Sequence, residues 1–187
     1  MNVAIFASGS GSNAENIIRY FEKNADISFF IVSNKQEAFV HERAKKLGVP
    51  SVTFSAKQFR ETDDVLHFLQ EKNIDFIVLA GFLLKIPGNI IAAFPDKIVN
   101  IHPALLPKFG GKGMYGSHVH EAVVEAGEKE SGITVHYINA QYDEGEIIFQ
   151  ARCEVLPSDS ADDVAEKVHA LEYLHFPKVI AELVNSQ

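Results

Sequence analysis

The N-terminal stretch Val3-Ala4-Ile5-Phe6-Ala7-Ser8-Gly9-Ser10-Gly11-Ser12-Asn13 decides the fold of this chain. Its first five residues are all apolar, which is typical of a strand that is buried on both faces. Serines and glycines end that run, and residues 13–21 then carry apolar side chains at helical spacing, with Asn13 as the expected N-cap. A strand, a glycine-rich turn and a helix in this order predict the first unit of an α/β fold.

Apolar runs continue to alternate with helical patterns through the first half of the chain. The expected elements are strands at 27–32, 76–80 and 98–101 and helices at 37–47 (with Gly48 as C-cap) and 65–72. Such alternation predicts βαβ units, and therefore a mostly parallel sheet with helices on both faces.

The second half changes character. Residues 133–138 and 147–155 resemble strands joined by a polar segment, and we expect them to form an antiparallel addition to the sheet. A closing helix is expected over 161–184, with a bend or break near Pro177, because proline removes a helical hydrogen bond.

Composition limits the classes of protein that this chain can represent. It has 187 residues, 47% hydrophobic and 22% charged, which predicts one folded domain over residues 1–187. A formal charge of −8 argues against a nucleic-acid partner, because phosphate backbones attract basic surfaces. One cysteine, Cys153, excludes an internal disulfide framework and is expected in the core. With no signal-like start and no long apolar run, we expect a cytoplasmic protein without a membrane partner.

The turn at residues 8–13 is the first candidate binding site. Glycines let backbone N–H groups approach an anion, and the start of a helix adds partial positive charge, which together suit a phosphate group. With Ala14 the run also matches a loose dinucleotide pattern, but the acidic residue expected about 20 positions on is replaced by Ser33-Asn34. A tight turn without any ligand remains the alternative.

Asn100-Ile101-His102-Pro103 is the second candidate, at the end of an expected strand. Asn100 and His102 would face the same side of the sheet, at the edge where α/β proteins bind ligands. An amide beside an imidazole suits acyl chemistry, since one group stabilises an oxyanion while the other moves a proton. A polar pair that merely caps the strand is an equal alternative.

Other polar residues are less specific. Asp143, in the turn between the late strands, could orient the His102 imidazole, although such turns are common connections. His118, His120 and His136 lack the spacing of a metal site, so no metal is expected. Glu172 lies at the edge of an apolar helical stripe and is expected to be solvated unless a ligand binds there.

Taken in order, these segments resemble the folate-dependent formyltransferases. The resemblance rests on residues 8–13, on Leu79-Ala80-Gly81-Phe82, on Asn100-Ile101-His102-Pro103-Ala104-Leu105-Leu106-Pro107 and on Gly132-Ile133-Thr134-Val135-His136 leading to Asp143-Glu144-Gly145. It covers essentially the whole chain. The N-terminal Gly-Ser-Asn run favours the branch that acts on glycinamide ribonucleotide in purine synthesis.

The resemblance implies direct transfer of the formyl group of 10-formyltetrahydrofolate, a cosubstrate, to the amine of glycinamide ribonucleotide through a tetrahedral intermediate. It implies Asn100, His102 and Asp143 as catalytic residues, Gly11, Ser12 and Asn13 at the substrate phosphate, and Glu172 at the ribose or glycyl end. It also implies a folate pocket formed by Leu83, Leu84, Lys85, Ile86, Pro87, Asn139, Ala140, Gln141 and Tyr142.

The same resemblance implies a Rossmann-like fold with one antiparallel strand. The N-terminal half would bind phosphate and the C-terminal half would bind folate and carry out catalysis. A monomer or homodimer acting on small molecules, without a metal, is expected.

Four other functions remain open. Hydrolysis of formyltetrahydrofolate would use the same three residues, but such deformylases usually carry an additional N-terminal regulatory domain. Formylation of initiator methionyl-tRNA usually requires a C-terminal tRNA domain. An NAD-linked oxidoreductase or a nucleotide-binding module could use the glycine-rich turn, but Ser33-Asn34 and the Asn100–His102 pair argue against these two classes.

Overall fold

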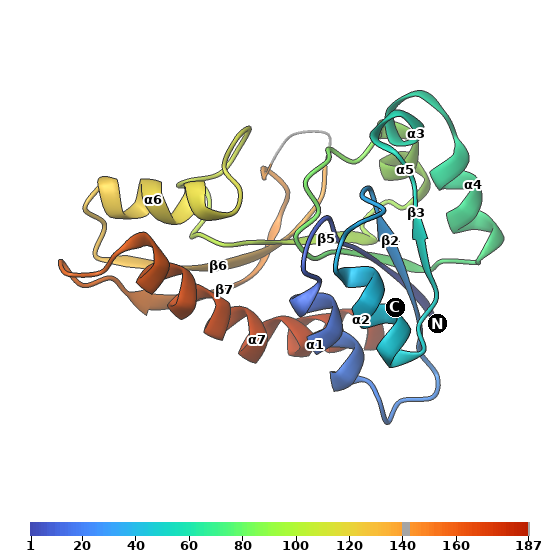
Figure 1. Cartoon of the computed structure of the whole chain (residues 1–187), viewed down its shortest axis with the longest axis horizontal. Helices are drawn as coiled ribbons and strands as arrows, with labels where there is room; N and C mark the ends of the chain where they lie inside the picture. Colours follow the sequence, from blue (N-terminus) through green and yellow to red (C-terminus); the bar gives the residue numbers. More distant parts are fainter. Residues whose placement is uncertain (140–142, 187) are drawn as a thin grey trace. The chain divides into compact units, whose positions relative to one another are not determined.

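The structure is a computed structural model that describes all residues except 140–142 and 187. The chain forms two compact units, Met1–Val99 and Asn100–Gln187, and Figure 1 labels most of their helices and strands. The expected single domain over residues 1–187 stays a prediction. No helix in the described part of the chain is long and apolar enough to cross a membrane.

The first unit is built on parallel strands. Its elements are β1 (Asn2–Phe6), α1 (Ser12–Tyr20), β2 (Ser28–Ser33), α2 (Val40–Leu47), β3 (Ser51–Thr53), α3 (Ala56–Glu61), α4 (Asp64–Glu71), β4 (Phe76–Leu79) and α5 (Gly88–Ala93). Strand β1 pairs in parallel with β2 on one side and β4 on the other, and β3 extends the sheet beyond β2. The predicted parallel sheet is therefore present in this unit.

The position of β1 explains its sequence. Val3 to Phe6 are completely buried, because helices and neighbouring strands enclose the central strand. Phe6 contacts Phe59 of α3 and Phe82 edge-on, so aromatic packing fixes α3 against the sheet. Helix α3 was not predicted, although its sequence carries a capping box between Ser55 and Gln58.

Gly11 controls the start of α1. It adopts a left-handed conformation (φ 72°), and an added Cβ would lie 2.3 Å from Cγ2 of Val40 in α2. A side chain is therefore excluded here both by backbone strain and by the close approach of α2. Helix α1 begins at Ser12 with Gly11 as N-cap, so the prediction of Asn13 as N-cap is wrong.

The second unit contains the antiparallel pair. Its elements are β5 (Ile98–His102, which begins in the first unit), α6 (Ser117–Glu125), β6 (Glu130–Tyr137), β7 (Ile147–Glu154) and α7 (Ala161–Asn185). Strands β6 and β7 are antiparallel, with Thr134 opposite Gln150, and the order is β5-β6-β7. Gly132 permits this pairing, since a Cβ there would lie 1.9 Å from the Ala151 carbonyl oxygen.

Helix α7 packs against α6 and against the β6–β7 pair. It starts with a capping box between Ser160 and Asp163. Of the bend or break expected near Pro177, the break is wrong, since the helix continues to Asn185, and the bend stays a prediction. Phe176 and Pro177 are buried, so packing offsets the hydrogen bond that proline removes.

Candidate active site

The end of β5 supplies the first two polar groups of the candidate site. His102 is buried, with 3% of its surface exposed, and Asn100 is half-buried. The Nε2 atom of His102 lies 2.7 Å from the Phe109 carbonyl oxygen. A carbonyl only accepts hydrogen bonds, so Nε2 carries the proton and the neutral ring presents an unprotonated Nδ1.

Asp143 joins this strand from the connection between β6 and β7. Its Oδ2 atom lies 3.7 Å from His102 Nδ1, and its Oδ1 atom lies 3.5 Å from His136 Nε2. The Gly111 N–H donates to Oδ2 at 3.0 Å and fixes the carboxylate. Asp143 therefore lies between two imidazoles, and the structure places it next to His102, the neighbour that the family resemblance implied.

His136, on β6, connects Asn100 to this arrangement. The amide nitrogen of Asn100 lies 3.2 Å from His136 Nε2, and His136 Nδ1 lies 2.9 Å from the Tyr137 carbonyl oxygen. Since the Tyr137 carbonyl only accepts hydrogen bonds, Nδ1 of His136 carries a proton, and Nε2 lies against both the Asn100 amide nitrogen and Asp143 Oδ1. We call these four residues, Asn100, His102, His136 and Asp143, the Asp143 cluster.

The sequence analysis missed His136 as a member of the site, because it considered this residue only as a metal ligand. The available signal was a polar side chain inside a strand that is otherwise buried, since His136 and Thr134 are both fully buried on β6. Buried polar groups are hydrogen-bonded, so such a residue indicates a polar neighbour.

Burial and charge set the protonation of the Asp143 cluster. Burial lowers the pKa of His102 below its ordinary value, against the opposing effects of Asp143 and the Phe109 carbonyl. Burial alone would raise the pKa of Asp143, but its contact with His136, the His102 ring and the Gly111 N–H together lower it. At neutral pH a neutral imidazole therefore stands beside an ionised carboxylate, which is an arrangement suited to proton transfer.

The glycine-rich turn lies in the first unit. The Arg43 guanidinium donates to the Ser10 carbonyl oxygen at 2.7 Å, and the first turn of α1 begins at Ser12. The Ser8 hydroxyl donates to Asn34 Oδ1 at 2.5 Å. Asn34 occupies the position at which a dinucleotide-binding protein has its ribose-binding acidic residue. In this chain the Asn34 side chain accepts a hydrogen bond from Ser8 and stabilises the turn.

The remaining predicted site residues fall into three groups. The Leu83 N–H donates to the Ser8 hydroxyl at 2.9 Å while 48% of Leu83 is exposed, so its side chain is open to a ligand. Ile86 is buried and Pro87 is the N-cap of α5. Ala140, Gln141 and Tyr142 lie outside the described residues. The folate-binding roles of Leu83, Leu84, Lys85, Ile86, Pro87 and Asn139 stay predictions.

Glu172 was expected to be exposed to solvent unless a ligand binds there, and the structure shows it buried. It lies in α7 with only 7% of its surface exposed. The reason is its place between Val168 and Phe176 on the buried face of the helix, which helical spacing of four residues creates. Among the described residues, no three His, Cys, Asp or Glu side chains are grouped so that they could hold a metal ion.

Comparisons with known proteins define the class. Residues 1–180 match the formyl transferase family, and the chain therefore belongs to that family. It is 37% identical to the phosphoribosylglycinamide formyltransferase of Haemophilus influenzae, over 95% of this chain and 84% of that protein. It is 36% identical to the chloroplastic phosphoribosylglycinamide formyltransferase of Arabidopsis thaliana, over 97% of this chain but only 64% of that relative's length.

Solved structures agree in fold. The phosphoribosylglycinamide formyltransferase of Streptococcus pneumoniae superposes with a TM-score of 0.86 at 36% identity, covering 98% of both chains. The Bacillus halodurans protein of the same name gives 0.88 at 33% identity, covering 98% of this chain and 95% of that one. The predicted fold class, a mostly parallel α/β sheet with an antiparallel pair, is confirmed. A cytoplasmic location stays a prediction, since the Arabidopsis relative is named chloroplastic.

Proposed function

We propose that this chain transfers the formyl group of 10-formyltetrahydrofolate to the amine of glycinamide ribonucleotide, a step of purine synthesis. The observation that carries the proposal is the Asp143 cluster, in which an amide, a neutral imidazole and an ionised carboxylate meet at the end of β5. The names of the similar proteins support the choice of substrates.

The reaction needs one bond to form and one to break at the formyl carbon. The neutral substrate amine attacks this carbon and gives a tetrahedral intermediate with negative charge on the formyl oxygen. The bond from carbon to N10 of the folate then breaks, and the proton lost by the amine goes to N10. Formylated ribonucleotide and tetrahydrofolate are the products, and no covalent bond to the protein forms.

The members of the Asp143 cluster are assigned roles in these reaction steps. One N–H of the Asn100 amide is directed to His136, and we assign the other to the developing oxyanion. His102 takes the amine proton at Nδ1, directly or through a water molecule. The imidazolium that forms is stabilised by Asp143, 3.7 Å away, and then returns the proton to N10.

Binding of the two substrates is assigned to other segments. We propose that Gly11, Ser12 and Asn13 hold the phosphate of the ribonucleotide at the start of α1, where helix N–H groups favour anions. Glu172 is proposed at the ribose or glycyl end. Folate is proposed to contact residues 83–87 and 139–142 and to act as a cosubstrate, without a metal ion.

Hydrolysis of formyltetrahydrofolate is the second candidate. A neutral His102 beside an ionised Asp143 could deprotonate a water molecule as readily as an amine. Selectivity for the amine would then come from positioning by the bound phosphate group.

The test is an assay of the Asp143 cluster with both substrates. His102→Ala and Asn100→Ala should each lower kcat by at least about 100-fold, and the double variant should lose far less than the product of the two effects. His118→Ala, which removes an exposed imidazole from α6, is the matched control and should retain kcat. Mass spectrometry identifies the formylated amine. Near-normal kcat in either cluster variant would remove that residue from the mechanism.

A further inference from the structure

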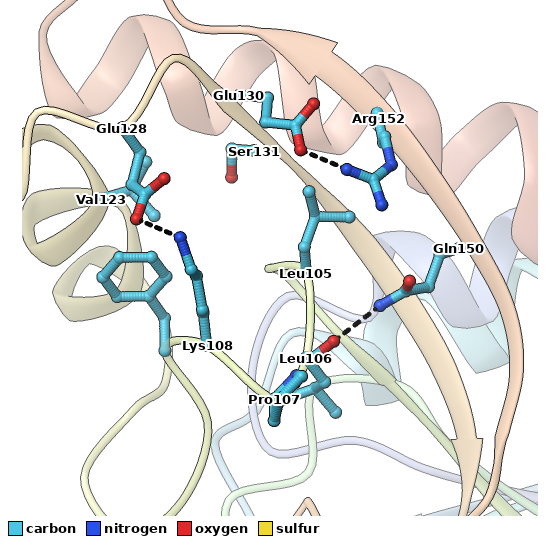
Figure 2. A pocket seen from close by; sticks show the side chains of 11 residues that line it. Leu105, Leu106, Pro107, Lys108, Val123, Glu128, Glu130, Ser131, Gln150 and Arg152 are labelled. Atoms are coloured by element: carbon cyan, nitrogen blue, oxygen red, sulfur yellow. Dashed lines mark hydrogen bonds and ion pairs between the residues drawn. The ribbon is translucent and has the colours of Figure 1, made fainter.

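A cavity of about 220 Å³ lies in the second unit, outside the Asp143 cluster. It is lined by the segment after β5, by the beginning of β6, by the adjoining part of β7 and by Val123 of α6, and it is partly open to solvent (Figure 2). None of the four residues of the Asp143 cluster lines it. Phe109 is the link between them, since it lines the cavity and its carbonyl accepts from His102.

The floor of the cavity carries one unsatisfied polar group. Ser131 has 2% of its surface exposed, and its hydroxyl has no hydrogen-bond partner among the described residues. Figure 2 shows this hydroxyl directed into the space between Leu105 and the Lys108–Glu128 pair. Proteins rarely leave a buried hydroxyl unpaired, so the group indicates a ligand atom that donates or accepts a hydrogen bond.

The other polar side chains of the lining are already paired. Lys108 lies 2.8 Å from Glu128, and Arg152 forms an ion pair with Glu130. The Gln150 side-chain amide donates to the Leu106 carbonyl oxygen at 3.0 Å and to the Thr134 hydroxyl at 2.9 Å. The lining therefore has no excess charge and does not favour a charged ligand over a neutral one.

The apolar part of the lining sets the size of the ligand. Leu106 and Val123 are buried, and Leu105 and Pro107 complete the apolar wall. A cavity of about 150 Å³ lined by apolar side chains holds benzene, so this larger space accommodates one ring with a polar substituent. The charged pairs, with Lys108 and Arg152 mostly exposed, form the rim.

We propose that this cavity is a binding site for a small uncharged ring compound with one hydroxyl or carbonyl group, which hydrogen-bonds to Ser131. The ring packs against the apolar wall, and its polar group satisfies the Ser131 hydroxyl. The proposal does not depend on the proposed formyl transfer, because it uses none of the groups of the Asp143 cluster.

Phenol, toluene and phenyl phosphate are the probes, titrated into the full chain up to about 10 mM, a range suited to ligands of this size. Amide resonances of Leu105 and Ser131 in NMR spectra report binding. Phenol should give saturable shifts, and Ser131→Ala should weaken its affinity by about three- to tenfold, the effect of losing one hydrogen bond. Toluene should bind both proteins equally, which also verifies that the variant is folded.

Ser158→Ala, at an exposed position before α7, is the matched control and should leave phenol affinity unchanged. The proposal is overturned if phenol gives no saturable shift, or if it binds the Ser131→Ala protein as tightly as the original. It is also overturned if phenyl phosphate binds as well as phenol, since the site would then select for charge.

Discussion

Replacing Asp143 by asparagine removes one charge from the Asp143 cluster while preserving its shape. The asparagine side chain can still accept the Gly111 N–H with its remaining oxygen, so the turn should stay in place. The ground state should change little, because the low pKa of His102 already keeps this ring neutral at pH 7. The loss should therefore fall on the step in which the imidazole becomes charged.

The distance between the two side chains gives the size of the effect. The Oδ2 atom of Asp143 is 3.7 Å from His102 Nδ1. At an effective dielectric constant of about 20, two unit charges at this separation attract each other by about 4 kcal/mol, and solvent screening makes this an upper figure. We expect kcat to fall by about 100- to 1,000-fold, which corresponds to about 3–4 kcal/mol.

Steady-state assays of formyl transfer between pH 5 and 8 provide the measurement. Because Asp143 raises the pKa of His102, its removal should also shift the acid limb of the kcat profile to lower pH. Glu144→Gln is the matched control, since Glu144 is the next residue and exposed. A loss of less than about threefold in Asp143→Asn, or an equal loss in Glu144→Gln, would refute the reasoning, because exposed charges are screened.

Two further predictions concern stability. Burial lowers the pKa of both His102 and His120. As pH falls below the ordinary histidine value of 6.5, the unfolded chain therefore binds more protons than the folded chain. The free energy of unfolding should decrease from pH 7 to pH 5, by at most about 1.4 kcal/mol per pH unit for each histidine. Urea denaturation of His120→Leu should show a shallower slope, and an unchanged slope would contradict the assignment. Inorganic phosphate should raise the melting temperature by binding at the start of α1, and Ser12→Ala combined with Asn13→Ala should abolish most of this shift. A comparable shift with NAD that survives both substitutions would favour the dinucleotide interpretation.

Local patterns in the sequence were sufficient for the elements with strong periodicity. The apolar runs of β1, β2, β4 and β5 were predicted because strand burial leaves an uninterrupted hydrophobic signature, and the antiparallel β6–β7 pair was predicted from two strand-like segments joined by a polar one. The helices α3 and α5, each of six residues, were missed because they are too short to show a helical period. The absence of a break at Pro177 could not be predicted, because the packing that stabilises α7 around it is tertiary.

The candidate site was only partly accessible from the sequence. Asn100 and His102 share a strand, so their proximity follows from the alternation of side chains along it. Asp143 meets them only because the β6–β7 connection returns to β5, which no local pattern shows. His136 joins them because β6 lies next to β5 in the sheet, which no local pattern shows either. The burial of Glu172 likewise depends on what α7 packs against.

The partition of the formyl group between amine and water tests the central claim most directly. Purified protein with 10-formyltetrahydrofolate alone should release little formate, and added glycinamide ribonucleotide should start rapid turnover with formyl on the glycyl amine. Free glycinamide should lose kcat as well as affinity, because the phosphate end supplies the binding energy that positions the amine. Fast formate release that glycinamide ribonucleotide does not change would contradict the account and assign hydrolysis to the Asp143 cluster.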